Sequence, residues 1–352
     1  MSRRIAVRRA VERMRAYHPP LEGRSRKLRL DFNENTIGCS LAVCRALAGL
    51  TPDQVAMYPE YEGAGRRLAR HFRVRPDELL LTNGTDDALR LIVDTFVESD
   101  SAILLVEPTF AMYRFYAELA GARIVALRYD RAMRFPLERV LRALRRVRPR
   151  VLFLANPNNP TGTLLEPPAL RQILGAASHT LVVVDEAYYE FSGVTVLPWI
   201  RRLSNLVVTR TFSKAAGLAG LRLGCVFANR RVAAGLRKAH SPYPVNAAAL
   251  AAGEAAARDG RSTERYAREV RRSKRELETA LARLGVSYYR GAANFVLADF
   301  GRRAPALLET LRRRGILLRD RRSDFGRVGY VRITVGTREQ TRRLVEAIEK
   351  LW

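Results

Sequence analysis

The strongest constraint on the fold is an alternation of short apolar runs with helical stretches, which extends from about residue 62 to residue 228. The runs at 102–106, 151–155 and 181–184 are unbroken by polar residues. A strand that is apolar on both sides must be covered on both sides, and parallel strands need a crossover, usually a helix, between them. The pattern therefore predicts an α/β fold, with a mostly parallel central sheet flanked by helices.

The chain changes its pattern after about residue 230, where long helical stretches come first and short strands follow. In the first part we expect strands at 78–82, 102–106, 123–127, 151–155, 181–185, 206–210 and 223–228, with helices at 40–50, 63–72, 86–97, 113–119, 137–147 and 168–177. In the second part we expect helices at 245–258, 262–284 and 338–351, with strands at 288–289, 294–299, 316–319 and 331–335. The second pattern is typical of a smaller α+β domain. We therefore predict an N-terminal arm, or part of the small domain, at 1–45, a large domain at 46–235 and a small C-terminal domain at 236–352.

Composition and length indicate a folded globular protein of 352 residues, with 47% hydrophobic and 28% charged residues. No apolar run reaches the roughly 18 residues of a membrane helix, and residues 1–10 lack the apolar core of a signal peptide. Cys39, Cys44 and Cys225 form no disulfide framework, and the four histidines lack metal-ligand spacing. We expect a cytoplasmic protein without a membrane anchor or a structural metal.

The net charge of +27 raises the question of a nucleic-acid partner. The basic residues are spread over predicted helices, as in 141–148, and the chain has no zinc-finger spacing or basic arm. We interpret the charge as a solvated, arginine-rich surface that also attracts small anionic substrates. The sequence therefore predicts neither a nucleic-acid nor a membrane partner.

Lys214 stands out because only five of the 62 basic residues are lysines, and this one lies among small and apolar residues at 211–224. Arginine keeps its proton in proteins, whereas a desolvated lysine can lose it and act as a nucleophile or Schiff-base amine. A lysine that happens to start a helix would look the same in this window. Lys214 is therefore a candidate reactive amine.

Three other polar segments follow predicted strands, and ligands of open α/β sheets bind beyond the carboxyl ends of strands. The segment 82–87 carries a glycine turn at a helix start, which suits a phosphate but also describes an ordinary capped helix. The segment 155–162 is a rigid loop with two prolines and several amides. The segment 185–189 places an acid at a strand end, as a helix cap or a site residue. Arg222 adds a cation shortly after the reactive lysine.

Taken together, these segments supply an amine, an acid, an amide, an aromatic ring and a phosphate cradle. Pyridoxal phosphate requires this set, because it needs a lysine for an imine, a carboxylate at its pyridine nitrogen and donors for its phosphate. The joint pattern is far more specific than any of its parts.

On these motifs the chain resembles the fold-type I, pyridoxal-phosphate-dependent aminotransferases of class I and II. The signature segments are Asn-Pro-Thr-Gly at 159–162, Asp-Glu-Ala-Tyr at 185–188, and Ser-Lys at 213–214 with Arg222. Within the class it most resembles the histidinol-phosphate aminotransferases, through 33–35, 58–60, 84–87, 107–110, 156–162, 293–295, 318–320 and 332–337. Thr36 stands where a proline is usual, and Gly-Thr-Asp-Asp at 84–87 replaces Gly-Ala-Asp-Glu. Both departures lie near binding loops.

The resemblance implies roles for the residues around the cofactor. Lys214 would form the Schiff base with pyridoxal 5'-phosphate and then carry the proton between substrate and cofactor, and Asp185 would face the pyridine nitrogen. Asn159 and Tyr188 would hydrogen-bond the phenolic oxygen. The other implied cofactor contacts are Phe110 on the ring, and Gly84, Thr85, Asp86, Thr211, Ser213, Arg222 and the partner subunit's Tyr58 at the phosphate. The last contact implies a homodimer with shared sites.

The resemblance also implies the substrate contacts. Arg332 would bind the α-carboxylate as a bidentate pair, and Arg319 would meet a second anionic group. Tyr17 and Asn33 would assist. The implied reaction is amino transfer between L-histidinol phosphate and 2-oxoglutarate, a step of histidine biosynthesis.

Three other functions stay open. An aromatic amino-acid aminotransferase could use the same pocket, because imidazole and phenyl rings are of similar size. A threonine-phosphate decarboxylase resembles this subfamily closely and would break the bond to the carboxylate instead. A nucleic-acid-binding regulator built on such a domain would need a further DNA-binding module, for which the residues before the first motif are too few.

Overall fold

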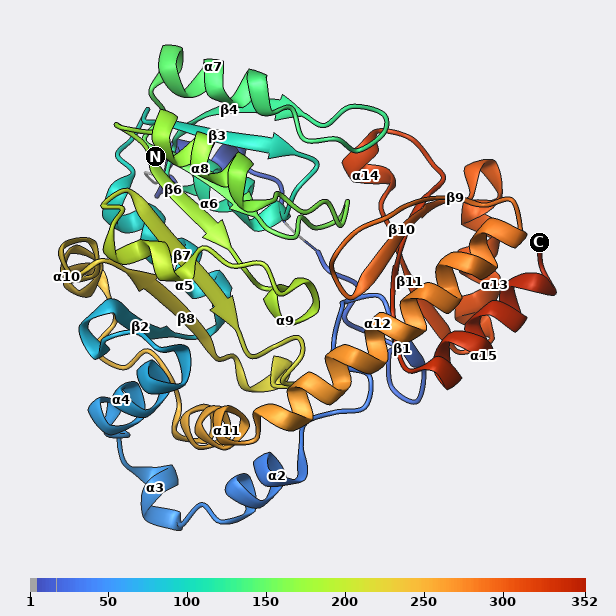
Figure 1. Cartoon of the computed structure of the whole chain (residues 1–352), viewed down its shortest axis with the longest axis horizontal. Helices are drawn as coiled ribbons and strands as arrows, with labels where there is room; N and C mark the ends of the chain where they lie inside the picture. The colour runs from blue at the N-terminus through green and yellow to red at the C-terminus, as the bar shows by residue number, and fades with distance from the viewer. Residues whose placement is uncertain (1–4, 17) are drawn as a thin grey trace.

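Two β-sheets organise the chain, and the computed structural model describes residues 5–16 and 18–352. Within these ranges the larger sheet has seven strands in the order β2-β8-β7-β6-β5-β3-β4, and the smaller has five in the order β1-β11-β12-β10-β9 (Figure 1). The larger sheet lies in the first two thirds of the chain. The smaller one combines the N-terminal arm with the last third.

The larger sheet is mostly parallel, as predicted. Its strands are β2 (Leu79–Thr82), β3 (Ala102–Glu107), β4 (Arg123–Arg128), β5 (Val151–Ala155), β6 (Leu181–Asp185), β7 (Leu206–Thr211) and β8 (Gly224–Ala228). Neighbours from β4 to β7 pair in parallel, whereas β8 runs antiparallel to both β7 and β2. The carboxyl ends of β5, β6 and β7 therefore meet at one edge of the sheet.

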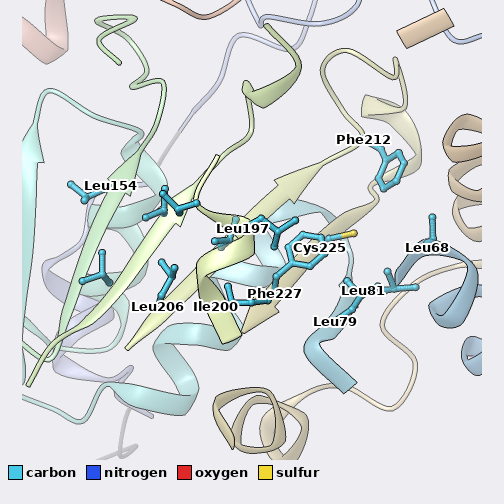
Figure 2. Close-up of a cluster of buried hydrophobic side chains, with 14 of the residues drawn as sticks. Leu68, Leu79, Leu81, Leu154, Leu197, Ile200, Leu206, Phe212, Cys225 and Phe227 are labelled. Atoms are coloured by element: carbon cyan, nitrogen blue, oxygen red, sulfur yellow. The ribbon is translucent and has the colours of Figure 1, made fainter. Parts of the chain in front are cut away.

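Helices cover both faces of this sheet because its strands are apolar on both sides. Successive strand residues point to opposite faces, so Leu104 and Leu105 belong to two different buried clusters. One face packs against α2 (Leu41–Ala48), α4 (Tyr61–Phe72), α7 (Leu137–Val147), α8 (Pro167–Ala176) and α11 (Ala247–Arg258). The other packs against α5 (Gly84–Phe96), α6 (Ala111–Leu119) and α10 (Arg230–Ala239). Figure 2 shows part of the first cluster, with Phe227 and Leu197 between the sheet and its covering segments.

The smaller sheet holds β9 (Ser287–Tyr289), β10 (Phe295–Asp299), β11 (Ile316–Asp320) and β12 (Tyr330–Thr334) in antiparallel pairs. Strand β1 (Leu28–Leu30) joins its edge in parallel with β11. Helices α12 (Gly260–Arg283), α13 (Ala304–Arg313) and α15 (Arg338–Glu349) pack on this sheet around a second apolar core (Figure 1). The remaining elements are α1 (Arg9–Arg13), α3 (Pro52–Ala56), α9 (Tyr189–Ser192), α14 (Arg322–Phe325) and the 3₁₀ turns Pro76–Glu78, Leu197–Arg201, Ala219–Leu221 and Gly301–Arg303.

Several short elements were not expected from the sequence. Helix α3 is one of them, and it forms because proline suits the first turn and Thr51 caps that turn together with Gln54. Helix α10 was missed because its sequence is arginine-rich and only Ala233 and Leu236 are buried. The expectation also omitted α13, β1, the single-turn helices α9 and α14, and the 3₁₀ turns.

We propose that the two sheets form two domains. Helix α2 at one end and α11 at the other pack in the core cluster of the larger sheet. The elements of the large domain therefore extend from Leu41 to Arg258, which is further at both ends than the predicted range of 46–235. None of the helices in the described ranges is both long enough and apolar enough to cross a membrane.

Candidate active site between the two sheets

Residues from both sheets meet beyond the carboxyl ends of β5, β6 and β7. Asp185 ends β6, Thr211 ends β7, and Lys214 follows shortly after. Arg332 comes from β12 of the smaller sheet, and its Nη1 donates to Asn159 Oδ1 at 2.6 Å. Four segments that the sequence singled out separately thus share one site.

Lys214 lies deep in this site, although its side chain keeps some contact with solvent. Its Nζ donates to the Phe32 carbonyl oxygen at 3.0 Å. Burial, together with the positive charge of Arg332, lowers the pKa of Lys214 to about 8. A substantial fraction of neutral amine, which is the nucleophilic form, is therefore present near neutral pH.

Asp185 is buried and held by two donors. Its Oδ2 accepts the Tyr113 hydroxyl at 2.8 Å, and its Oδ1 accepts the Ala187 N–H at 3.1 Å. Burial raises the pKa of Asp185 to about 6, and the hydrogen bond from Tyr113 opposes that rise. The carboxylate is therefore mostly ionised at neutral pH and suits a cationic partner.

Tyr188 is connected to the N-terminal arm through Asn33. The Asn33 Nδ2 donates to the Tyr188 hydroxyl at 2.9 Å, and Thr334 of β12 donates to Asn33 Oδ1 at 3.0 Å. Asn33 has a positive φ of 57°, which this short polar side chain tolerates. Asn33, predicted as a substrate contact, here orients Tyr188. Burial raises the pKa of Tyr188, so its hydroxyl keeps its proton.

The start of α5 forms a cramped cradle together with the end of β7 and the start of β8. Gly84 has a φ of 78°, and a Cβ there would overlap the Arg222 guanidinium. A Cβ on Gly224 would lie 2.6 Å from the Gly84 carbonyl carbon. Arg222 pairs with Asp86 at 3.1 Å, and the Thr85 Oγ1 is buried without a hydrogen-bond partner. Backbone therefore approaches closely where side chains are excluded, as anion sites require.

Two further predicted residues border this cradle. Thr211 pairs with Gly224 across the sheet, and its Oγ1 accepts the Ser213 N–H at 3.1 Å. Both side chains are buried. Their hydroxyls lie on the short loop that leads to Lys214.

Three arginines share one face of the smaller sheet. Arg319 and Arg332 are paired across β11 and β12, and Arg321 lies two residues beyond Arg319. Arg321 pairs with Asp324 at 2.7 Å, and the Arg319 guanidinium lies 5.3 Å from the Phe32 ring centre. Burial and the positive charge of Arg321 lower the pKa of Arg332 to about 9. The face therefore carries an excess of positive charge suited to anionic groups.

Arg321 and Tyr113 were both missed by the sequence analysis. Strand alternation from Arg319 would have found Arg321, because residues two apart share a face. No motif marks Tyr113, whose contact with Asp185 joins residues 72 positions apart.

The side chain of Glu186, the second acid of the segment 185–189, does not contact the candidate active-site residues. It accepts Arg210 Nε and Nη2 at 3.0 and 2.8 Å, and also binds Thr195. The Arg210 guanidinium stacks 3.6 Å above the Tyr189 ring centre. Glu186 therefore belongs to a buried ion pair that fixes the segment after β6.

Of the remaining predicted residues, Tyr58 and Phe110 can be placed in the described part of the chain. Tyr58 is 74% exposed and stacks on Tyr243 with ring centres 4.1 Å apart. Tyr17 lies outside the described residues. Phe110 is partly exposed and meets Tyr113 edge-on at 5.6 Å.

Comparison with known proteins agrees with this geometry. The family model described as "Aminotransferase class I and II" matches residues 25–348. The chain belongs to this aminotransferase family. Lys214, Asp185, Asn159 and Arg332 all fall within the matched range. The fold-type I α/β architecture predicted for an aminotransferase of this class is therefore confirmed.

Individual relatives narrow the comparison. The chain is 41% identical to a histidinol-phosphate aminotransferase of Symbiobacterium thermophilum, over 98% of both proteins. The histidinol-phosphate aminotransferase of Sinorhizobium meliloti, solved in complex with pyridoxal-5'-phosphate, has a TM-score of 0.89 at 25% identity, with full coverage of both chains. An L-threonine-O-3-phosphate decarboxylase of Porphyromonas gingivalis has a TM-score of 0.81 at 25% identity, covering 92% of this chain and 99% of its own. Among class I and II aminotransferases, this chain is most similar to histidinol-phosphate aminotransferases.

Proposed function

We propose that this aminotransferase uses pyridoxal phosphate to transfer an amino group between L-histidinol phosphate and 2-oxoglutarate. The observation that carries the proposal is the convergence of a buried amine, Lys214, with a buried carboxylate, Asp185, and an arginine-rich face at Arg332. The similarity to histidinol-phosphate aminotransferases along the whole chain supports the substrate.

The residues present fit pyridoxal phosphate. The buried Thr85 hydroxyl has no hydrogen-bond partner. Gly84 and Gly224 have no side chains, so the backbone beside Arg222 is not covered. Both features suit a phosphate group, which accepts many hydrogen bonds and carries negative charge. The groups that favour the Asp185 carboxylate, namely the Tyr113 hydroxyl, the Ala187 N–H and the Thr209 hydroxyl, are all neutral, so Asp185 can still accept a cationic pyridine N–H.

The remaining contacts follow from this fit. When bound, pyridoxal phosphate supplies an aldehyde that bonds amines and a ring that takes up electrons from the substrate Cα. Lys214 would be its covalent attachment point, and Asp185 would hold the pyridine nitrogen protonated. Asn159 and Tyr188 would hydrogen-bond its phenolic oxygen, and Phe110 would pack against its ring. The phosphate would be bound by Gly84, Thr85, Asp86 (through its place at the helix start), Thr211, Ser213 and Arg222.

Lys214 would also move the proton that amino transfer requires. When it is not bonded to the cofactor, the neutral amine of Lys214 would take the proton from the substrate Cα and deliver it to the cofactor carbon that carried the aldehyde. A pKa of about 8 places the amine close to the working pH, where a general base is most effective.

The arginine face would orient the substrate. Arg332 is buried and already directed to Asn159, so a carboxylate bound there would lie beside the cofactor's phenolic side. Arg319 lies one strand away on the same face and would bind the second anion, the phosphate of the donor or the distal carboxylate of 2-oxoglutarate. Asn33 would act through Tyr188, and Tyr17 stays a prediction.

Two other reactions use the same groups. A threonine-phosphate decarboxylase shares this fold at a TM-score of 0.81, and it too would need sites for a carboxylate and a phosphate. An aromatic amino-acid aminotransferase would need Arg332 for the carboxylate of its aromatic substrate, which has no second anionic group for Arg319. The three reactions differ in which substrate bond is broken and in the need for Arg319.

Steady-state kinetics with a substrate panel tests the proposal. We expect kcat/KM to be highest for histidinol phosphate and about 10²-fold or more lower for histidinol, because the latter leaves the second anion site unpaired. Phenylalanine, tyrosine and O-phosphothreonine complete the panel, with CO2 measured throughout. Equal turnover of histidinol and histidinol phosphate, or CO2 release from O-phosphothreonine, would contradict the proposal.

We further propose a homodimer that shares its sites. Large apolar side chains are exposed around α2, α3 and the loop before α11: Ile37, Leu41, Val55, Met57, Tyr58 and Tyr243. Exposed large apolar side chains that gather on neighbouring elements are typical of an interface. It includes Tyr58, which the family resemblance assigns to the partner's phosphate site.

Mixing two inactive variants tests the shared site. Lys214→Ala and Tyr58→Ala chains, unfolded together and refolded, should regain about a quarter of the unaltered activity, because half of the dimers are hybrids with one intact site. Each variant refolded alone is the control. If the mixture is no more active than the average of the two variants, Tyr58 does not act across subunits.

The cytoplasmic location and the absence of a nucleic-acid partner also remain proposals. Arginines on helix surfaces form salt bridges with acidic neighbours, as in Arg268–Glu264 and Arg66–Glu62. Part of the positive charge is therefore paired within the chain. A salt-sensitive affinity for duplex DNA at physiological ionic strength would contradict the second proposal.

A further inference from the structure

Tyr113 is a fully buried tyrosine that no motif marks, yet it contacts the most deeply placed acid of the site. It lies in the first turn of α6, which packs on the face of the sheet opposite to Figure 2's cluster. We propose that Tyr113 is a positioning residue that holds the Asp185 carboxylate for the pyridine nitrogen. The inference rests on the proposed use of pyridoxal phosphate.

The contact geometry leaves Tyr113 little freedom. Its hydroxyl donates to Asp185 Oδ2 at 2.8 Å, and neither side chain is more than 5% exposed. Its ring stacks on Phe153 of β5, with centres 5.1 Å apart and planes 7° from parallel. The same ring meets Phe110 edge-on. One side chain therefore connects Asp185 to Phe110, the aromatic residue expected to pack against the cofactor ring.

The hydrogen bonds around Asp185 leave room for the cofactor. An ionised carboxylate offers about four lone-pair positions, and the Tyr113 hydroxyl and the Ala187 N–H take one on each oxygen. The neutral Thr209 hydroxyl of β7 also favours the charged form of Asp185. All three groups are neutral, so none competes with a pyridinium as the counter-charge. The carboxylate is thus fixed in orientation while its charge stays unpaired.

The phenol acts only as a donor. Burial and the negative charge of Asp185 raise the pKa of Tyr113 well above its usual value, so the hydroxyl keeps its proton. The other ionisable groups whose charges act on the pair are Asp86 of α5, Tyr188 after β6 and Tyr129 after β4. Because hydrogen bonding favours the charged form of a carboxylate, the phenol opposes the effect of burial on Asp185.

Replacing Tyr113 by phenylalanine removes this donor but keeps the ring on Phe153. Asp185 should then take up a proton at a higher pH, and a protonated acid cannot serve as the pyridinium's counter-ion. We expect affinity for pyridoxal phosphate at pH 7 to fall about 10-fold. We expect kcat to fall by a similar factor, with KM within about 2-fold of its original value, because substrate is bound on the other side of the site.

The decisive readout does not depend on activity. Equilibrium dialysis of the cofactor-free protein against pyridoxal phosphate gives its dissociation constant at each pH. For the unaltered protein, affinity should decline as the pH falls through about 6, where Asp185 is protonated. In Tyr113→Phe the decline should begin about one pH unit higher. Tyr61→Phe is the matched control, since its hydroxyl donates only to the Val245 carbonyl, at 2.9 Å.

A double-mutant cycle separates positioning from simple packing. In an Asp185→Asn background, Tyr113→Phe should change the dissociation constant less than 2-fold, because the partner whose charge it sustains is gone. An equal effect in both backgrounds, or a pH profile that matches that of Tyr61→Phe, overturns the inference. Failure of the unaltered protein to bind pyridoxal phosphate would instead contradict the proposed cofactor.

Discussion

Lys214→Ala is expected to lower the rate of amino transfer by about 10⁴-fold or more, because one side chain provides both the covalent attachment and the base. The absorbance band of the lysine imine should disappear, leaving only that of unattached pyridoxal phosphate. The variant should still bind pyridoxal phosphate non-covalently, since the phosphate cradle and Asp185 are unchanged. Absorbance spectra, together with borohydride reduction and peptide mapping, measure this directly.

Lys274 provides a matched control for Lys214. It is also a buried lysine whose pKa burial lowers to about 8, but it lies on α12 and donates to the Gly291 and Ala293 carbonyls. Lys274→Met should keep the absorbance band and lose about 1–3 kcal/mol of unfolding free energy, because two carbonyls lose their donor. If borohydride reduction labels Lys274, or if the imine absorbance band survives in Lys214→Ala, Lys214 is not the residue to which pyridoxal phosphate is attached.

Arg332→Lys is expected to lower kcat/KM by about 10²- to 10³-fold for every amino-acid-like substrate. A lysine retains the charge but not the planar fork that binds a carboxylate with two hydrogen bonds, and it cannot reach both Asn159 and the Asp31 carbonyl as Arg332 does. Steady-state kinetics with glutamate, phenylalanine and histidinol phosphate measures the effect. Histidinol phosphate has no α-carboxylate. The size of the decrease in kcat/KM for this substrate would therefore show whether its phosphate binds at Arg332.

Arg319→Lys gives the contrasting pattern. It should impair glutamate and histidinol phosphate and leave phenylalanine within about 2-fold, because Arg319 would bind the distal carboxylate of the first and the phosphate of the second, and phenylalanine has neither. Arg302→Lys, an exposed arginine in the 3₁₀ turn Gly301–Arg303, is the control and should change nothing. An Arg332→Lys variant with unaltered kinetics for all three substrates would contradict the arginine face as the substrate site.

The sequence predicted the large sheet well because strands buried on both faces, such as β5 and β6, are written as unbroken apolar runs. It missed α10, whose exposed basic residues obscure the two residues that face the core, and it also missed α13. The helical pattern of apolar residues was weakest in helices that bury only one narrow stripe of side chains. Local pattern therefore identified the elements with the largest apolar surfaces.

The candidate site was predictable where chemistry follows a strand end, as for Asp185 and Lys214. It was not predictable where a side chain acts through another one, as Asn33 does on Tyr188 and Tyr113 on Asp185. These contacts join residues 155 and 72 positions apart, and nothing in the local sequence records the pairing. Their discovery required the three-dimensional arrangement.

The position of β1 determines when during synthesis the site can form. This strand pairs with β11, and Asn33, just beyond it, binds Thr334, which lies 301 residues later. The arm emerges first from the ribosome but has no sheet to join until almost the whole chain has been made. The larger sheet can fold earlier, because its strands are nearer one another in sequence. An incomplete chain that lacks β11 and β12 would therefore carry Lys214 on a formed sheet, yet would have neither Arg332 nor an anchored Asn33.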